Sequence, residues 1–270
     1  LLYSVTTMHT LFNITNTMIL IWFIPQIEKI VSWIIPQKAE KEVFRLKYIQ
    51  GGPLSTAELS LDEAEQEIVH FSEICYNGFG YMRQAINEKD PVKFGELREK
   101  LIKYEAITDR IEYEIADYLN EVSKGEISSS SAVRINGMYK IIGELESIGD
   151  SGDAIGRILA RRNEHGLSFD EQQLKRLGRM CDLLDDAFKA MTNNLKAPYT
   201  SLKDITNAQD AEYNINECRN TLREEHIINI EENSSYNYQV GVFYMDIVAE
   251  LEKMGDFMIN VSEAKIAENG

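Results

Sequence analysis

Apolar side chains recur at intervals of three and four residues through most of the chain after residue 59. Two such series are Leu97, Leu101, Tyr104, Ile111, Ile115 and Tyr118, and then Met138, Ile141, Leu145, Ile148, Ile155 and Leu159. This spacing places the apolar side chains on one face of an α-helix, as is typical of helices that bury that face in a core. With turn signals between the periodic segments, the pattern predicts an all-α fold of six helices, over residues 59–89, 91–123, 130–163, 168–195, 200–229 and 235–267.

The first 35 residues have a different pattern, in which apolar residues dominate without helical periodicity. An apolar run extends from Met8 to Ile24 and resumes as Ile30–Ile35 after Pro25. A membrane-spanning helix needs about 20 mostly apolar residues, so we expect a transmembrane helix that kinks or ends near the proline. The alternative is a buried helix of a soluble protein. Four basic residues follow the apolar stretch, Lys38, Lys41, Arg45 and Lys47. Because basic residues next to a membrane helix tend to lie on its cytoplasmic side, we expect the downstream chain to be in the cytoplasm.

These patterns divide the chain into three parts. Residues 1–36 are expected to be the C-terminal end of a membrane domain, residues 37–58 a linker and residues 59–268 a cytoplasmic helical domain. The sequence begins with Leu1 rather than methionine, so we also expect it to be a fragment of a longer chain.

The net charge argues against one class of partner, and the cysteines indicate the redox state of the compartment. The formal net charge is −16 and the sequence pI is about 4.8, which argues against nucleic-acid binding because that affinity depends on clustered Lys and Arg. The cysteines Cys75, Cys181 and Cys218 are widely spaced and lie within helical patterns. They are expected to be reduced thiols in the core, in a reducing compartment, and not zinc ligands.

An internal repeat is the most informative feature of the helical part. ELESIGD at Glu144–Asp150 returns as ELEKMGD at Glu250–Asp256, an offset of 106 residues. One helix earlier, Glu105 and Asp109 have a weaker counterpart in Glu212 and Asn216. A duplicated three-helix unit, over about residues 59–164 and 168–268, accounts for the pattern.

Each repeat places carboxylates four residues apart, on the same side of a helix. In the first repeat Asp153 follows Asp150 by three residues and is a further candidate metal ligand, while Gly149, Gly152 and Gly156 would let a neighbouring helix approach closely. Crowded carboxylates favour a neutralising cation, and oxygen ligands from two helices suit a divalent or ferric ion. A solvated acidic face is the alternative that the spacing leaves open.

An enzymatic role is not expected from these residues. The repeated carboxylate motifs carry no histidine of the Glu-x-x-His kind, and the four histidines lie at no ligand-like spacing from one another, which argues against an oxygen-activating di-iron enzyme. A metal-dependent hydrolase lacks a plausible nucleophile set, and a surface cluster would not exclude water.

The segment LEKMGDFMINVSEA at Leu251–Ala264 resembles the signature of PhoU-like phosphate-uptake regulators, and the resemblance extends over roughly residues 60–268. Such proteins can hold multinuclear metal clusters on the bundle surface through paired Glu-x-x-x-Asp motifs. The resemblance therefore implies two ligand sets, the second weakened by a neutral Asn. They are Glu105, Asp109, Glu146 and Asp150 in the first repeat, and Glu212, Asn216, Glu252 and Asp256 in the second.

The N-terminal part is similar to another family. HTLFNITNTMILIWFIP at His9–Pro25 looks like the closing membrane helix of bacterial sodium/phosphate cotransporters, and Gly51–Ile68 is similar to that family's junction with a PhoU-like domain. This similarity implies sodium-dependent phosphate transport across the inner membrane, with phosphate and sodium as ligands and the transport site outside these residues. The alternative is a PhoU-type signalling regulator or metal-binding module, as a homodimer or with signalling proteins as partners.

Overall fold

The computed structural model describes residues 6–17, 46–198, 201–232 and 236–267. The chain divides into two units, Leu1–Arg45 and Leu46–Gly270. In the first unit, residues 6–17 form an exposed helix. None of the helices in the described ranges has the length and apolar character needed to span a membrane. The expected membrane segment lies outside the described residues beyond position 17, so that expectation stays a prediction.

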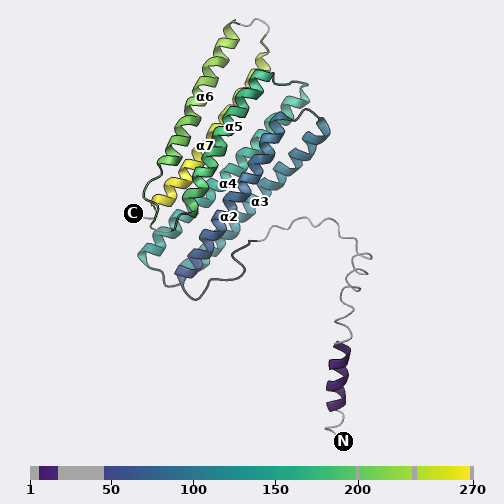
Figure 1. Ribbon diagram of the computed structural model, residues 1–270, viewed down its shortest axis with the longest axis vertical. Helices are drawn as coiled ribbons and strands as arrows, with labels where there is room; N and C mark the ends of the chain where they lie inside the picture. Colours follow the sequence, from purple (N-terminus) through teal and green to yellow (C-terminus); the bar gives the residue numbers. More distant parts are fainter. Residues whose placement is uncertain (1–5, 18–45, 199–200, 233–235, 268–270) are drawn as a thin grey trace. The chain divides into compact units, whose positions relative to one another are not determined.

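The second unit is a bundle of six long helices (Figure 1). Their bounds are α2 (Ala57–Asn87), α3 (Pro91–Ser123), α4 (Ser129–Glu164), α5 (Glu171–Lys196), α6 (Thr206–Glu232) and α7 (Tyr238–Ala267). The described residues of this unit contain no strand, so the predicted all-α fold is confirmed.

Capping residues explain where two of the helices begin. The Asp90 carboxylate accepts the backbone N–H groups of Val92 at 2.8 Å and Lys93 at 3.2 Å, with Pro91 in the first turn of α3, as the Asp-Pro pair predicts. Helix α5 begins three residues later than predicted, because Asp170 and Gln173 form a reciprocal capping box. Such a box fixes a helix start, and it was not recognised in the sequence.

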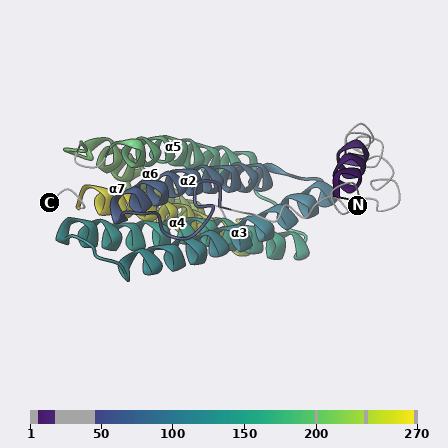
Figure 2. The ribbon, with the colours of Figure 1, turned by 90° about the horizontal axis from the view of Figure 1, so that it is seen from below.

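The six helices form two groups of three, joined along two helix pairs. Helices α2, α3 and α4 pack on one another, as do α5, α6 and α7, and the groups meet through α4 with α7 and α2 with α5 (Figures 1 and 2). The repeated motif lies on α4 and α7. Its equivalent leucines, Leu145 and Leu251, are both fully buried, so the two copies of the motif contribute to one shared core.

Glycines set the spacing of α3 against α4 and of α6 against α7. A Cβ atom at Gly149 would lie 2.3 Å from the Thr108 side-chain oxygen, and one at Gly255 would lie 2.9 Å from Ile215 Cδ1. Thr108 and Ile215 are related by an offset of 107 residues, so the same close contact occurs in both groups. The expectation for Gly152 is wrong, because a Cβ there would meet nothing within 4 Å.

Candidate metal centre

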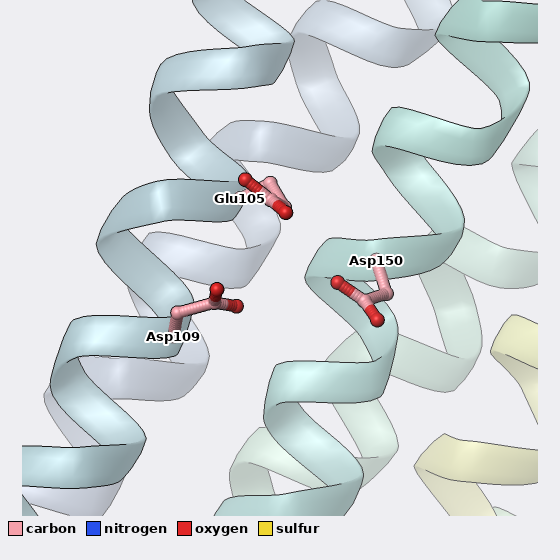
Figure 3. A group of neighbouring side chains, drawn as sticks. All are labelled: Glu105, Asp109 and Asp150. Carbon is pink, nitrogen blue, oxygen red and sulfur yellow. The ribbon is translucent and has the colours of Figure 1, made fainter.

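Three carboxylates converge where α3 passes α4. Glu105 and Asp109 lie one turn apart on α3, and their side chains face Asp150 on α4 (Figure 3). One oxygen from each residue lies within 4.8 Å of the others, with Glu105 partly exposed and the two aspartates exposed. The close approach at Gly149, next to Asp150, brings the two helices together at this level.

Burial and neighbouring carboxylates raise the pKa values of Glu105 and Asp150. Partial burial and then the charges of Asp109, Asp153 and Asp150 raise the pKa of Glu105. Partial burial and the charge of Asp109 raise the pKa of Asp150, although Arg157 opposes this. Repulsion of this kind favours either proton uptake or a bound cation. Because the donors are all carboxylate oxygens, they fit a hard cation.

Glu146 lies one turn before Asp150 on α4 and outside the group of three. Burial, followed by the charges of Asp150, Glu112 and Asp109, raises the pKa of Glu146 to about 7. Its Oε2 atom accepts a long hydrogen bond from Ser147 Oγ, at 3.3 Å. When it is ionised, above about pH 7, Glu146 adds a negative charge beside the site.

Asp153, also predicted as a ligand, has another environment. It is buried, with 4% exposure, and forms ion pairs with Arg98 of α3 and Arg157 of α4. Its charge is thereby compensated within the protein, and its side chain is not part of the three-carboxylate group.

In the second repeat, most of the predicted ligands form hydrogen bonds or ion pairs with other protein groups. Asn216 Nδ2 donates to Glu212 Oε1 at 3.3 Å, and Arg219 forms an ion pair with Glu252. Asp256 has its pKa raised by burial and by the charges of Glu252 and Glu212. Over the described residues, three potential ligands come together in the first repeat and not in the second.

Glu112 and Arg219 explain this difference between the repeats, and the sequence reasoning missed both. With the 107-residue offset that relates Glu105 to Glu212, Glu112 of α3 corresponds to Arg219 of α6. A carboxylate that strengthens the negative potential in the first repeat is thus replaced by a cation in the second. Extending the α3–α6 comparison by one more turn would have revealed it.

The raised pKa of Glu146 predicts a pH-dependent stability. Between about pH 4.5, the ordinary value, and about pH 7, the folded chain holds a proton that the unfolded chain has released. Stability from this group is therefore present at low pH and lost as the pH rises through 7. With EDTA present, Glu146→Gln should unfold at higher urea concentration than the wild type at pH 8, with little difference at pH 4.5. An equal gain at both pH values would contradict the assigned cause.

Comparison with known proteins agrees with this architecture. Residues 68–159 match the family model described as PhoU domain. The chain contains a PhoU domain. The match includes Glu105, Asp109, Glu146 and Asp150. None of the curated proteins matches the chain.

Two crystal structures share the fold of the PhoU domain and the helices that follow it. The phosphate transport system regulatory protein PhoU from Streptococcus pneumoniae superposes with a TM-score of 0.61 at 17% identity, over 79% of this chain and 96% of that one. PhoU from Pseudomonas aeruginosa gives 0.64 at 15% identity, over 78% and 97%. At these identities the similarity shows the fold, which is the PhoU-like bundle that the sequence predicted.

Proposed function

We propose that the chain acts as a phosphate-signalling regulator of the PhoU type and that its first repeat binds a divalent or ferric cation. The proposal of a cation site rests on one observation: Glu105, Asp109 and Asp150 converge inside the matched PhoU domain. The regulatory role is supported by the fold shared with a phosphate transport system regulatory protein.

The residues of the site fit a role in binding and not in catalysis. Glu105 and Asp109 would hold the cation from α3, and Asp150 would hold it from α4, so that binding links the two helices. A bound cation would supply the positive charge that offsets the repulsion among these carboxylates. Because Asp109 and Asp150 are exposed, the site is open to water and accessible to a partner surface. A signalling protein or a second copy of the chain is the partner that we propose.

Sodium-dependent phosphate transport is the second candidate function. It is favoured by the apolar run Met8–Ile24 and the basic residues that follow residue 37. On this hypothesis the PhoU domain would lie on the cytoplasmic side of the inner membrane and regulate the transporter. Further membrane helices encoded upstream in the same reading frame would support the hypothesis, and an upstream stop codon would contradict it.

Deletion of the gene tests the regulatory role. In the deletion strain we expect phosphate-responsive gene expression to lose its normal dependence on external phosphate. A transcriptional reporter compared at high and low phosphate measures this, alongside uptake of radiolabelled phosphate. Complementation with the wild-type gene is the control. Identical reporter responses and identical uptake in the two strains would contradict the proposal.

A further inference from the structure

A cavity of about 440 Å³ lies at one end of the bundle, where α2 ends, α3 begins, α4 ends and α5 begins. The two connections that form it, between α2 and α3 and between α4 and α5, lie at the same end of the bundle in Figure 1. Its walls are largely apolar, with Phe94, Phe169 and Leu174 among them, and Arg162 is also part of the lining. Cavities of this size and character commonly hold small molecules.

Arg162 is buried, and none of the carboxylates in the described part of the chain pairs with it. Its side chain is 5% exposed, its Nε and Nη2 atoms donate to Asn163 Oδ1 at 3.1 and 2.7 Å, and its guanidinium carbon lies 4.5 Å from the centre of the Phe169 ring. Within the described ranges no Asp or Glu oxygen lies within 4 Å of it. Burial lowers the pKa of Arg162.

The other buried arginine of the described residues, Arg134, has the carboxylate partners that Arg162 lacks among them. Arg134, with 7% exposure, forms ion pairs with Asp62 at 2.7 Å and Glu65 at 3.0 Å. A buried charge is costly unless it is paired, and Arg134 follows that rule. Although the chain has a net charge of −16, no carboxylate of the described residues forms an ion pair with Arg162, so the lining of the cavity holds a buried positive charge that is not neutralised by an ion pair.

The end of α4 holds this guanidinium in place. Gly166 has a φ of +66°, and the backbone N–H groups of Gly166 and Leu167 donate to the carbonyls of Asn163 at 2.9 Å and Arg162 at 3.1 Å. This is a Schellman motif, which ends a helix in a fixed geometry. Phe169, which stacks on the guanidinium, is itself in edge contact with Tyr244 at 6.1 Å between ring centres. The cation is therefore preorganised for a ligand.

We propose that this cavity binds a small organic anion, with its phosphate or carboxylate group on Arg162 and its apolar body against Phe94 and Leu174. Lys89, an exposed residue of the lining, adds a second positive charge. Glu88 also lines the cavity, but its Oε1 atom accepts the backbone N–H groups of Lys89 and Asp90 at 2.9 and 2.8 Å. The site is separate from the carboxylates of the candidate metal centre.

Calorimetric titration of the full chain with phenyl phosphate and with benzoate tests the proposal. Two partial probes are titrated beside them: inorganic phosphate represents the anionic head group alone, and phenol represents the apolar body alone. EDTA in the buffer prevents phosphate binding through a cation at the acidic site. At least one of the two aromatic anions should bind, and more tightly than either of the partial probes. Failure of both to bind at millimolar concentration, or equal affinity for inorganic phosphate, would overturn the proposal.

Two arginine variants test the role of the guanidinium. Arg162→Met should weaken binding by about 10- to 100-fold, the range expected for a charge-assisted hydrogen bond. Arg161→Met removes the same charge from an exposed neighbour that does not line the cavity, and should change the affinity by less than about twofold, given the screening of exposed charges. Equal losses in the two variants would indicate a general charge effect and overturn the proposal.

A second pair of variants retains Arg162, in case its replacement prevents folding. Ser168 is exposed and lines the cavity, so substitutions there should be tolerated. Ser168→Asp would place a carboxylate beside the guanidinium and should reduce binding by at least about tenfold, as expected for a competing ion pair. Ser168→Asn has nearly the same shape without the charge and should bind as the wild type does. Unchanged binding in Ser168→Asp would count against the site.

Discussion

Replacing Glu105 by Gln and Asp150 by Asn together should weaken Mn²⁺ binding by well over tenfold, since even changes to the outer partners of metal ligands cost about 10- to 100-fold. The double substitution removes one carboxylate from each of the two helices that form the site and keeps the size of both side chains. Neutral amides are poorer ligands for hard cations than carboxylates. Titration followed by the electron paramagnetic resonance of free Mn²⁺ measures the affinity, and elemental analysis of the purified chain measures any metal carried from the cell.

The second repeat provides the matched control for this experiment. Glu212→Gln with Asp256→Asn alters the corresponding positions and the same number of charges, but at a place where Arg219 and Asn216 already compensate the carboxylates. This variant should bind Mn²⁺ as the wild type does. Equal losses in the two double variants would show nonspecific attraction to an acidic surface. A wild-type chain that carries no metal and binds no Mn²⁺ would contradict the cation site itself.

The helices and one face of the candidate site could be predicted because they depend on local spacing. Residues four apart share a helix face whatever the tertiary structure, which is why Glu105 and Asp109 lie together. Asp150 was added to this set by the resemblance to PhoU-like regulators, which implies paired Glu-x-x-x-Asp motifs on two helices. Asp153 illustrates the limit of this reasoning. It lies near Asp150 by spacing, but its partner Arg98 is 55 residues away in sequence and meets it only through the packing of α3 on α4.

The difference between the repeats and the cavity at the bundle end depend on contacts between distant segments. Arg219 compensates Glu252 across 33 residues, and a charge on α6 does not indicate by itself which helix it faces. In the sequence, Arg162 is one of several basic residues near the end of a helix. Only the arrangement of two loops and four helix ends shows that it is buried and that no described carboxylate pairs with it. Predicting such features requires the pairing of helices, which periodicity does not provide.

Gly149→Ala should destabilise the chain by about 1–3 kcal/mol, the usual cost of forcing an extra methyl group into a packed contact. The new Cβ would lie 2.3 Å from Thr108 Oγ1 and 2.9 Å from Thr108 Cγ2. The threonine cannot turn away freely, because its hydroxyl donates to the Glu105 carbonyl at 2.8 Å. Helix α3 must therefore move away from α4. The midpoint of urea unfolding measures the loss.

Gly152→Ala is the control on the same helix, since a Cβ there meets nothing within 4 Å. It should be neutral or stabilising by up to about 1 kcal/mol, because alanine favours a helix interior over glycine. Destabilisation equal to that of Gly149→Ala would contradict the assigned contact.

The double variant Gly149→Ala with Thr108→Ala separates the contact from other effects of the alanine. Removing the hydroxyl and the methyl group of Thr108 relieves the two shortest contacts, so the double variant should lose less stability than the sum of the two single variants. Because Gly149 lies beside Asp150 and Thr108 lies between Glu105 and Asp109, Gly149→Ala should also separate the three carboxylates and weaken Mn²⁺ binding. Restored Mn²⁺ affinity in the double variant would show that helix spacing, and not the carboxylates alone, determines the strength of the site.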